Sequence, residues 1–489
     1  MRCPHHPGQR NWTVRYALVV SLAFGLASLN GCVVGPDFKP PSSPVPARWT
    51  ASPATAAEVD LARWWTVFGD STLTSLEERA VQSNLELARA AARVRQARAA
   101  RRGAVAGLGP AADASGAYRR SRSPAVDAGE SRAPGVKNGT IEGTVSDQYQ
   151  AGFDAGWELD LFGGVRRGIE AAEADLQAAV EARRDVLVTL TAEVARTYME
   201  LRSFQQRIAI AKGNLAAQAH SAELTRKRFR AGFVSGLDVA NAAALAATTA
   251  SQIPNLEASA RQAVYSLGLL LGREPAALWA ELSPPADIPA APPATPAGVP
   301  SELLRRRPDI RRAEAEIHAA TARVGVATAD LFPRFTLTGS VGLQASDFSS
   351  WFTWPQRLWS FGPSASWRVF DTGRTRANIA QQEAVQEQAL LAYRQTVLAA
   401  LQEVESALIA SSKEQERRQS LVEAVAANRK AVELASRLYT DGQVEFLNVL
   451  DAERSLYASE DALAQSTGQV LTGQVALFKA LGGGWNEDG

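Results

Sequence analysis

The chain contains an internal repeat, and this repeat constrains the fold more than any other feature of the sequence. The stretch 228–239 is similar to the stretch 437–449, with Gly232 aligned to Gly442 at an offset of 210 residues. A repeat of this size indicates two similar structures in tandem, so each element predicted in one half is expected again in the other. The same offset relates two further pairs, Trp157 with Trp367 and Gly272 with Gly482.

The offset is larger upstream of the tryptophans. Pro110 aligns with Pro333 at an offset of 223, so the first half has 13 extra residues before Trp157. They fall in a Gly-, Ser- and Arg-rich stretch from about 119 to 147, which predicts a longer loop. A Pro- and Ala-rich stretch, 283–301, separates the halves and is interpreted as a semi-extended linker.

The hydrophobic period changes in the same order in both halves. Residues 73–108 and 309–331 have apolar side chains three and four positions apart, which predicts helices. Apolar residues at every second position follow, over 149–161 and 335–343, and indicate strands with one apolar face. The turn of the second strand pair is rich in aromatic residues, as are the rims of outer-membrane barrels: Trp351, Phe352, Trp354, Trp359 and Phe361.

Long helices are predicted after the strands. Between Leu187 and Leu215 apolar residues recur every seven positions, the spacing of coiled-coil packing, and residues 165–230 contain no proline. Residues 373–439 form the counterpart, and a second helix returns after each turn. The prediction is a mainly α chain with a small β part, four strands in all, and two tandem repeats of the order helix, strand, strand, long helix, turn, helix.

These patterns predict four segments. They are a signal peptide at 1–31, a first repeat at 32–282, the linker at 283–301 and a second repeat at 302–489. The first repeat is predicted to contain a strand pair at about 112–162 and a helical hairpin at about 165–272, and the second a strand pair at about 334–371 and a hairpin at about 373–482.

Composition excludes several classes of function. The chain has 52 Lys and Arg against 51 Asp and Glu, which argues against a protein that binds nucleic acid by neutralising phosphates. With two cysteines and four histidines in 489 residues, we expect no metal site and no cofactor. Neither a phosphate-binding loop nor a nucleophile with a histidine partner is recognisable, so we expect no enzymatic activity.

The N-terminus has the anatomy of a bacterial secretory signal. Three arginines precede an apolar stretch at 16–29, and the segment ends Leu29-Asn30-Gly31-Cys32. This ending resembles the lipobox of bacterial lipoproteins, which predicts that Cys32 becomes the lipid-anchored first residue. Val33 follows the cysteine at the position where, in lipoprotein families, an aspartate would favour retention in the inner membrane, so outer-membrane sorting is expected.

Four strands are too few to close a barrel in a membrane, where open sheet edges would leave backbone groups without hydrogen bonds. More than one chain is therefore required. Three chains would supply twelve strands.

Several motifs in order carry a resemblance to a known family. They are residues 32–38, Trp64-Trp65 with Phe68-Gly69-Asp70, Arg307-Pro308-Asp309-Ile310 with Ala313-Glu314, and both Gly-x-Val turns. Over nearly all of the mature chain the sequence resembles the outer-membrane factors of tripartite efflux pumps, the TolC-like group, in their NodT-type lipoprotein branch.

The resemblance implies a homotrimer. It implies a twelve-stranded outer-membrane β-barrel, four strands per chain, continued by a long periplasmic α-helical barrel. The trimer would be a passive duct that exports drugs or other small molecules, and its partners would be a periplasmic membrane fusion (adaptor) protein, an inner-membrane RND-type pump and outer-membrane lipid.

The resemblance also assigns roles to residues of the two helical turns. Leu447, Asn448 and Asp451 are similar to the residues that narrow the periplasmic aperture in the family, and Asp238 is a candidate partner for Arg437 or Tyr439. The residues expected to dock the adaptor are Gly232, Val234, Ser235, Leu237, Asp238, Gly442, Val444 and Leu447.

Two other functions stay open. One is an outer-membrane duct for type I protein secretion, which a single sequence does not separate from a drug duct. The other is a periplasmic coiled-coil scaffold lipoprotein without a pore, against which the paired strands argue.

Overall fold

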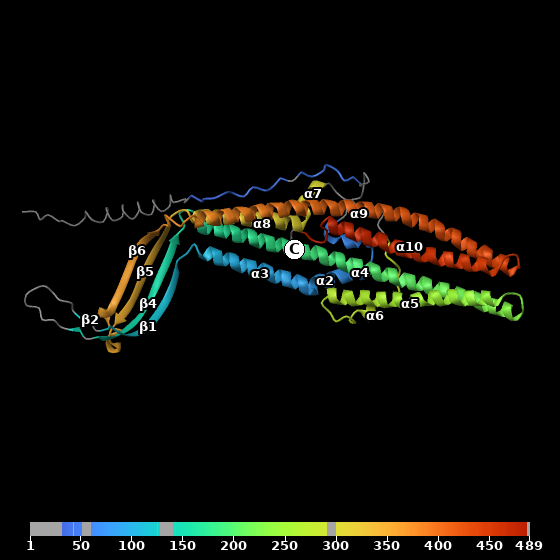
Figure 1. The fold of residues 1–489 in the computed structure, drawn as a ribbon, viewed down its shortest axis with the longest axis horizontal. Coiled ribbons are helices and arrows are strands. Elements are labelled where there is room, and N and C mark those ends of the chain that lie inside the picture. Colours follow the sequence, from blue (N-terminus) through green and yellow to red (C-terminus); the bar gives the residue numbers. More distant parts are fainter. Residues whose placement is uncertain are drawn as a thin grey trace, which may run out of the picture. The chain divides into compact units, whose positions relative to one another are not determined.

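The structure, a computed structural model, describes residues 32–42, 44–50, 60–124, 126–127, 140–141, 143–290 and 300–486. The described chain is mainly helical with a small sheet of four long strands (Figure 1), which confirms the predicted fold class. The predicted signal peptide lies outside the described residues, as does most of the second half of the predicted linker.

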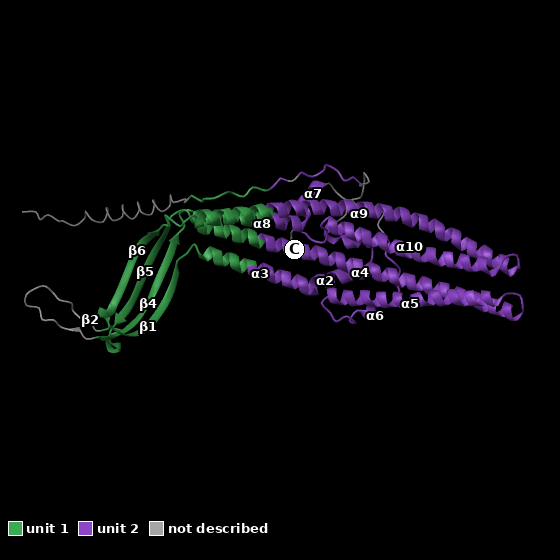
Figure 2. Cartoon of the chain, in the orientation of Figure 1, with its two compact units in different colours: residues 1–40, 97–176, 316–389 green, residues 41–96, 177–315, 390–489 purple. Residues whose placement is uncertain are grey.

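The chain forms two compact units, and each unit takes segments from both repeats (Figure 2). Unit 1 comprises residues 1–40, 97–176 and 316–389. Unit 2 comprises residues 41–96, 177–315 and 390–489.

Unit 1 contains an antiparallel sheet with the strand order β1-β4-β5-β6. Within it Phe153 lies opposite Val341, which in turn lies opposite Trp359. A short ladder between β2 and β3, in the longer loop of the first repeat, was not predicted. The strands are β1 (Ala111–Arg122), β2 (Val126–Asp127), β3 (Thr140–Ile141), β4 (Val145–Leu159), β5 (Arg334–Ala345) and β6 (Arg357–Ser366).

The two tryptophans of the repeat make the same contact in unit 1. The indole nitrogen of Trp157 donates to the carbonyl oxygen of Leu108 at 2.8 Å, and that of Trp367 donates to Leu331 at 3.0 Å. Each tryptophan therefore ties the inner end of a strand pair to the end of the helix that precedes it. This shared contact explains why both positions carry tryptophan.

Helices make up most of the other described residues, and several pass from one unit into the other. The two longest, α4 and α9, each have 67 residues. The helices are η1 (Leu61–Phe68), α2 (Ser71–Ser83), α3 (Leu85–Ala106), α4 (Gly164–Arg230), α5 (Gly236–Leu270), α6 (Trp279–Leu282), α7 (Pro300–Arg306), α8 (Pro308–Ala329), η2 (Phe348–Ser350), η3 (Trp354–Gln356), α9 (Arg374–Thr440) and α10 (Phe446–Ala480).

The single helix predicted over 73–108 is wrong, because Asn84 divides it into α2 and α3. The Asn84 side chain accepts a hydrogen bond from the Leu87 amide at 2.8 Å and donates to the carbonyl of Leu270 at 2.8 Å. Asn84 thus starts the new helix and holds it to the end of α5. A partner almost 190 residues away is invisible to local periodicity.

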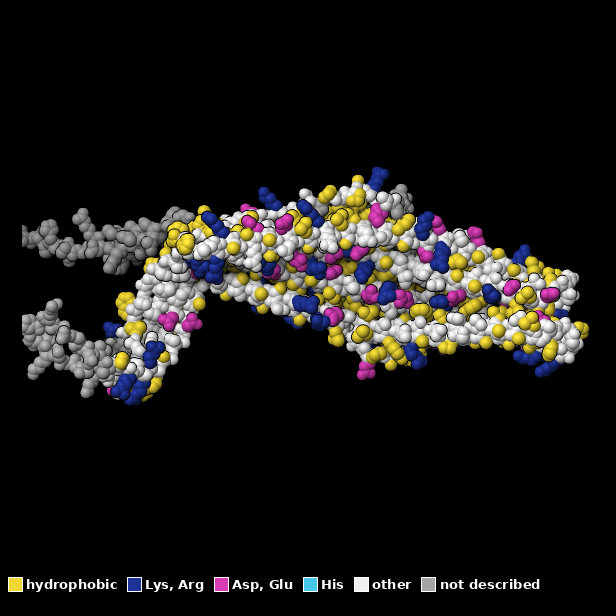
Figure 3. Space-filling model, viewed as in Figure 1, with side chains coloured by type: hydrophobic (Ala, Val, Ile, Leu, Met, Phe, Trp, Pro, Cys, Tyr) yellow, Lys and Arg dark blue, Asp and Glu magenta, His cyan; other side chains and the backbone are white. Residues whose placement is uncertain are grey.

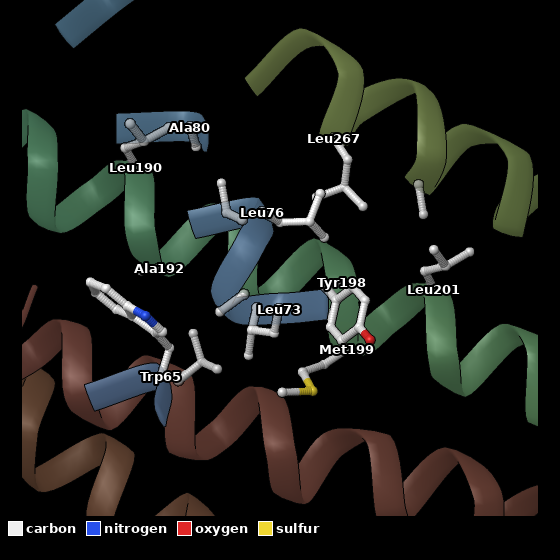
Figure 4. Packing of buried hydrophobic residues seen from close by; sticks show 14 of the residues in the cluster. Trp65, Leu73, Leu76, Ala80, Leu190, Ala192, Tyr198, Met199, Leu201 and Leu267 are labelled. Carbon is white, nitrogen blue, oxygen red and sulfur yellow. The ribbon is translucent and has the colours of Figure 1, made fainter. Parts of the chain in front are cut away.

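The hydrophobic core of unit 2 lies where α2 packs on α4 and α5 (Figure 4). The predicted heptad residues Val194 and Leu201 are fully buried there. Trp64 of η1 stacks on Phe478 of α10, with ring centres 5.0 Å apart. The coiled-coil spacing of α4 therefore marks a real packing face. Among the residues that the structure describes, no helix is long and apolar enough to cross a membrane.

Candidate functional site

The turns at the ends of the two long hairpins are built in the same way. In the α4–α5 turn, Phe233 donates its amide to the carbonyl of Arg228 at 2.9 Å, and Gly232 donates to Phe229 at 2.9 Å. The α9–α10 turn repeats both bonds, from Gln443 to Leu438 and from Gly442 to Tyr439. This is the Schellman arrangement, which satisfies the last carbonyls of a helix.

The glycine of each turn is required by backbone geometry. Gly232 has a φ of 81° and Gly442 has a φ of 74°, and residues other than glycine rarely adopt this region. A Cβ added at either glycine would meet nothing within 4 Å. Space is therefore available at both predicted tip glycines, and only the backbone angle restricts the residue.

The two turns differ at the start of the returning helix. Ser235 and Asp238 form a capping box at α5, in which the Asp238 carboxylate accepts from the Ser235 amide at 3.0 Å and from its hydroxyl at 2.8 Å. In α10 the equivalent cap, Glu445, makes no side-chain capping bond. A capping box satisfies two helix donors, so the α5 start is the better secured of the two.

In the described chain the Asp238 carboxylate is engaged by Ser235, and its pairing with Arg437 or Tyr439 in a closed state stays a prediction. Arg437 instead lies 3.2 Å from Glu433 of its own helix. The partner of Tyr439 is Arg228, whose guanidinium lies 4.3 Å from the centre of the tyrosine ring.

Arg228 connects the two hairpins. Its guanidinium donates to the carbonyl of Tyr439 at 2.9 Å and to that of Thr440 at 3.1 Å. These carbonyls belong to the last turn of α9, where a helix presents its partial negative charge. One side chain of α4 thus caps the C-terminus of α9.

A small apolar cluster lies beneath the turns. Tyr439 and Phe446 have ring centres 5.3 Å apart, and Val444, a predicted tip residue, is half-buried against them. The Tyr439 hydroxyl is buried and has no hydrogen-bond partner among the described residues. The cluster consists of Ala222, Ala242, Tyr439, Phe446, Val449 and Leu450.

The three residues predicted to narrow an aperture share one face of α10. Leu447 is 54% exposed, and Asn448 and Asp451 are also exposed, whereas Val449 and Leu450 are buried on the opposite face. The structure thus leaves Leu447, Asn448 and Asp451 free to face another surface or water.

The α4–α5 turn presents more apolar surface than the sequence suggested. Leu237, a predicted tip residue, is 68% exposed, while Val234 is half-buried. Phe233 is 79% exposed and Phe229 nearly half exposed, and neither was singled out. An aromatic residue on each side of an αL glycine would have been the available signal.

Near the turns, α4 and α10 contact each other through polar side chains that are spaced seven residues apart on α4. Arg207 pairs with Asp461 at 2.8 Å, and two heptads further Ser221 donates to Glu453 at 2.5 Å. Burial raises the pKa of Glu453, and the Ser221 hydroxyl opposes that shift. Between them Asn214 donates to Glu460 at 2.9 Å.

The sheet of unit 1 has one polar and one apolar face. On the polar face Ser340 and Ser360 share a hydrogen bond at 2.7 Å, as do Thr336 and Ser364. The opposite face carries the largest exposed side chains of the strands. The apolar face includes Ala114, Phe153, Val341, Trp359 and Phe361, and the polar face Ser115, Gln150, Thr338, Ser340 and Ser360.

The segment after Cys32 is held firmly in unit 1. Arg167, whose side chain is 4% exposed, donates to the carbonyl of Val34 at 3.2 Å and pairs with Asp37 at 2.7 Å. Phe38 stacks on His318 with ring centres 4.4 Å apart. Cys32 itself is exposed, and its thiol is free.

Across the described ranges, no group of three or more His, Cys, Asp or Glu side chains is arranged to hold a metal ion.

Comparison with known proteins agrees with this geometry. The family described as Outer membrane efflux protein matches residues 76–273 and 299–483. The chain is 31% identical to Nodulation protein T of Rhizobium leguminosarum bv. trifolii, covering 94% of this chain and 96% of that protein. It is 34% identical to Outer membrane protein OprJ of Pseudomonas aeruginosa, covering 96% of each.

A solved structure of the outer-membrane channel OprN superposes with a TM-score of 0.85 at 40% identity, over 93% of this chain and all of that one. The family match covers more than half of the chain, and the relatives are matched over nearly their whole length. The chain therefore belongs to the outer membrane efflux protein family and is the outer-membrane component of an efflux system.

Proposed function

We propose that three copies of this chain form a passive duct that carries small molecules out across the outer membrane. The observation that carries the proposal is the sheet of unit 1, with an exposed apolar face, a polar face and two edge strands, β1 and β6. An apolar face suits lipid and a face of hydroxyl and amide groups suits water.

The edge strands support association of several copies. A strand edge in lipid leaves backbone donors and acceptors unpaired, at a cost of several kcal/mol for each group. Pairing β6 of one copy with β1 of the next removes both edges. Three copies then give a closed sheet of twelve strands.

Exposed apolar side chains on the long helices also call for a neighbouring copy. On α9, Leu391 and Leu398 are seven residues apart and more than half exposed, and on α5 Leu269 is 73% exposed. Large apolar side chains in a row on a helix surface favour burial against another helix. A second copy is the simplest partner for both helices.

The aperture is assigned to the exposed face of α10. Around a threefold axis, Leu447 would form an apolar ring and Asp451 an acidic ring one turn further along, with Asn448 beside them. Three carboxylates at one level repel one another and attract cations, which is tolerable only in a water-filled opening.

Opening is assigned to the contacts between α4 and α10. When Arg207 and Asp461 separate, or Ser221 and Glu453, water can replace each lost hydrogen bond, so the net cost per bond is about 1–3 kcal/mol. An apolar core of the same size would resist separation more strongly. The tip halves of the two hairpins are therefore the parts expected to move.

The exposed tip residues are assigned to docking of a periplasmic adaptor protein. Phe233 and Leu237 on one turn, with Leu447 on the other, offer exposed apolar contacts, and the half-buried Val444 lies beside Leu447's turn, around backbone fixed by Gly232 and Gly442. An inner-membrane pump of the RND type would supply energy and select the cargo, because the chain itself is expected to perform no reaction and to hold no cofactor.

Cys32 is assigned as the lipid-bearing first residue of the mature chain. The contacts of Arg167 and His318 with this segment would hold the acyl chains close to the rest of unit 1. This anchor supplements the sheet, which provides the main attachment to the membrane.

The test is the native mass of the full-length protein extracted from outer membranes in mild detergent. A trimer is expected. A stable monomer in the outer-membrane fraction would contradict the proposal, because four strands with open edges would then have to lie in lipid.

A further inference from the structure

The outer end of β1 carries a run of cations that alternate between the two faces of the sheet. Residues 111–122 pair with β4 in one unbroken register, so neighbouring side chains point to opposite faces. Arg120 and Arg122 share the apolar face with Tyr118. Arg119, opposite Gln148, lies on the polar face.

Aromatic side chains surround this end of the apolar face. The rings of Tyr118 and Tyr149 have centres 4.8 Å apart, and Tyr149 lies 5.6 Å from both Phe348 and Trp351. Tyr118 is more than half exposed. Tyrosine and tryptophan concentrate where a membrane meets water, since their rings prefer the apolar side and their polar atoms the wet side.

Positive charge exceeds negative charge at this place. The Arg120 side chain is 66% exposed, and its Nε lies 3.7 Å from Asp147. The same Asp147 oxygen accepts a hydrogen bond from the Tyr118 hydroxyl at 2.9 Å. Asp147 is therefore shared between Arg120 and Tyr118, while the same face carries a second guanidinium group, that of Arg122. Figure 3 shows Lys and Arg side chains gathered at this end of the sheet.

We infer that Arg120 and Arg122 bind a phosphate group of a lipid in the outer leaflet, with its acyl chains on the apolar face of the sheet. The inference rests on the proposed position of the sheet in the outer membrane. Two guanidinium groups on one face, about 7 Å apart along the strand, can bracket one phosphate with paired hydrogen bonds. The lipid is the phosphorylated glycolipid of that leaflet, lipopolysaccharide.

The aromatic cluster and the apolar face supply the rest of the site. Sugar rings of the headgroup can pack on Tyr118 and Tyr149, and acyl chains can lie along Phe153 and Val341.

The test measures lipopolysaccharide bound to the full-length trimer. Protein purified in mild detergent is titrated with lipid A, and bound lipid is counted by native mass spectrometry. The double variant Arg120→Gln, Arg122→Gln should bind lipid A at least about tenfold more weakly, because two charge-assisted contacts are lost.

A matched control is available one residue away. Arg119→Gln removes the same charge from the same strand on the polar face, and its affinity should stay within about twofold of the unmodified protein. The single variant Arg122→Lys, with Arg120 unchanged, should keep most of the affinity for lipid A because it keeps the charge. Equal affinity in the double variant, or equal loss in Arg119→Gln, would overturn the inference.

The two proposals can fail separately. If the unmodified protein is a trimer in the outer-membrane fraction and the double variant binds lipid A as well as it does, the lipid site is wrong and the duct stands. If the unmodified protein is a monomer, the duct itself is wrong, whatever lipid it binds.

Discussion

The guanidinium of Arg228 lies 4.3 Å from the ring centre of Tyr439 and donates to the carbonyl oxygen of the same residue at 2.9 Å. One arginine at the end of α4 thus contacts both the ring and the backbone of Tyr439 in the last turn of α9. This contact joins the two hairpins close to the proposed aperture.

Replacing Arg228 should therefore loosen the tips. Arg228→Ala removes a cation–π contact and two hydrogen bonds to carbonyls, which should cost about 2 kcal/mol of unfolding free energy and raise the conductance of the reconstituted trimer. Arg230→Gln, at an exposed position two residues away, is the control and should change neither. Unchanged conductance in Arg228→Ala would show that this contact does not restrain opening.

Asp451→Ala should raise the single-channel conductance and lower the preference for cations, since it removes three carboxylates from one level of the opening. Planar-bilayer recording measures both quantities. Asp441→Ala is the matched control, because Asp441 is an exposed acid in the preceding turn and outside the proposed ring. If the two variants behave alike, Asp451 does not line the constriction.

Gly232→Ala should destabilise the α4–α5 turn by about 1–2 kcal/mol, because a Cβ disfavours the positive φ although it would touch no neighbour. Gly213→Ala tests the same change inside α4, at a helical glycine with open space around it. It should stabilise the protein by about 0.5–1 kcal/mol. Thermal unfolding in detergent compares them, and a loss of similar size in both would argue against backbone strain as the cause.

Glu77 is fully buried in unit 2, and both of its carboxyl oxygens lack a side-chain hydrogen-bond partner among the described residues. Burial raises its pKa well above the usual value, against a smaller opposing effect of the Ala195 backbone. The folded state therefore keeps a proton that the unfolded chain loses above about pH 4.3. Stability from this group is present at lower pH and falls as the pH rises toward the folded pKa.

Glu77→Gln should flatten that part of the pH profile, because it removes the titrating group. Melting temperatures between about pH 4.5 and 7.5 measure the slope, which for one group is at most about 1.4 kcal/mol per pH unit. Glu78→Gln is the control, since Glu78 is exposed and pairs with Arg63 at 2.8 Å. If the slope of stability against pH persists in Glu77→Gln, it arises from other carboxyl groups.

Much of the fold could be predicted because the repeat relates residues that make the same local contacts in both halves. Gly232 and Gly442 end a helix with the same two hydrogen bonds, and Trp157 and Trp367 tie a strand pair to its helix. These contacts depend on residues nearby in the sequence or on a repeated spacing. Each half therefore supports the interpretation of the other.

The features that were missed depend on residues far apart in the chain. Asn84 breaks a helix because Leu270 offers it an acceptor, and Arg228 is the partner of Tyr439 in the described chain. Neither contact leaves a periodic signal. Glu77 was different: it lies one helical turn from Leu73 and Ala80, on the buried face of α2, so its position could have been recognised from the sequence.

The polar face of the sheet in unit 1 offers few free hydrogen-bonding groups to a solute. Its serine and threonine hydroxyls are largely engaged with one another, as in Ser340 with Ser360 and Thr336 with Ser364. In the proposed duct, a solute at these positions would meet hydroxyl groups that already have hydrogen-bond partners. If this face lines the proposed duct, cargo would pass it without tight binding, and selection of the cargo would depend on the proposed inner-membrane pump.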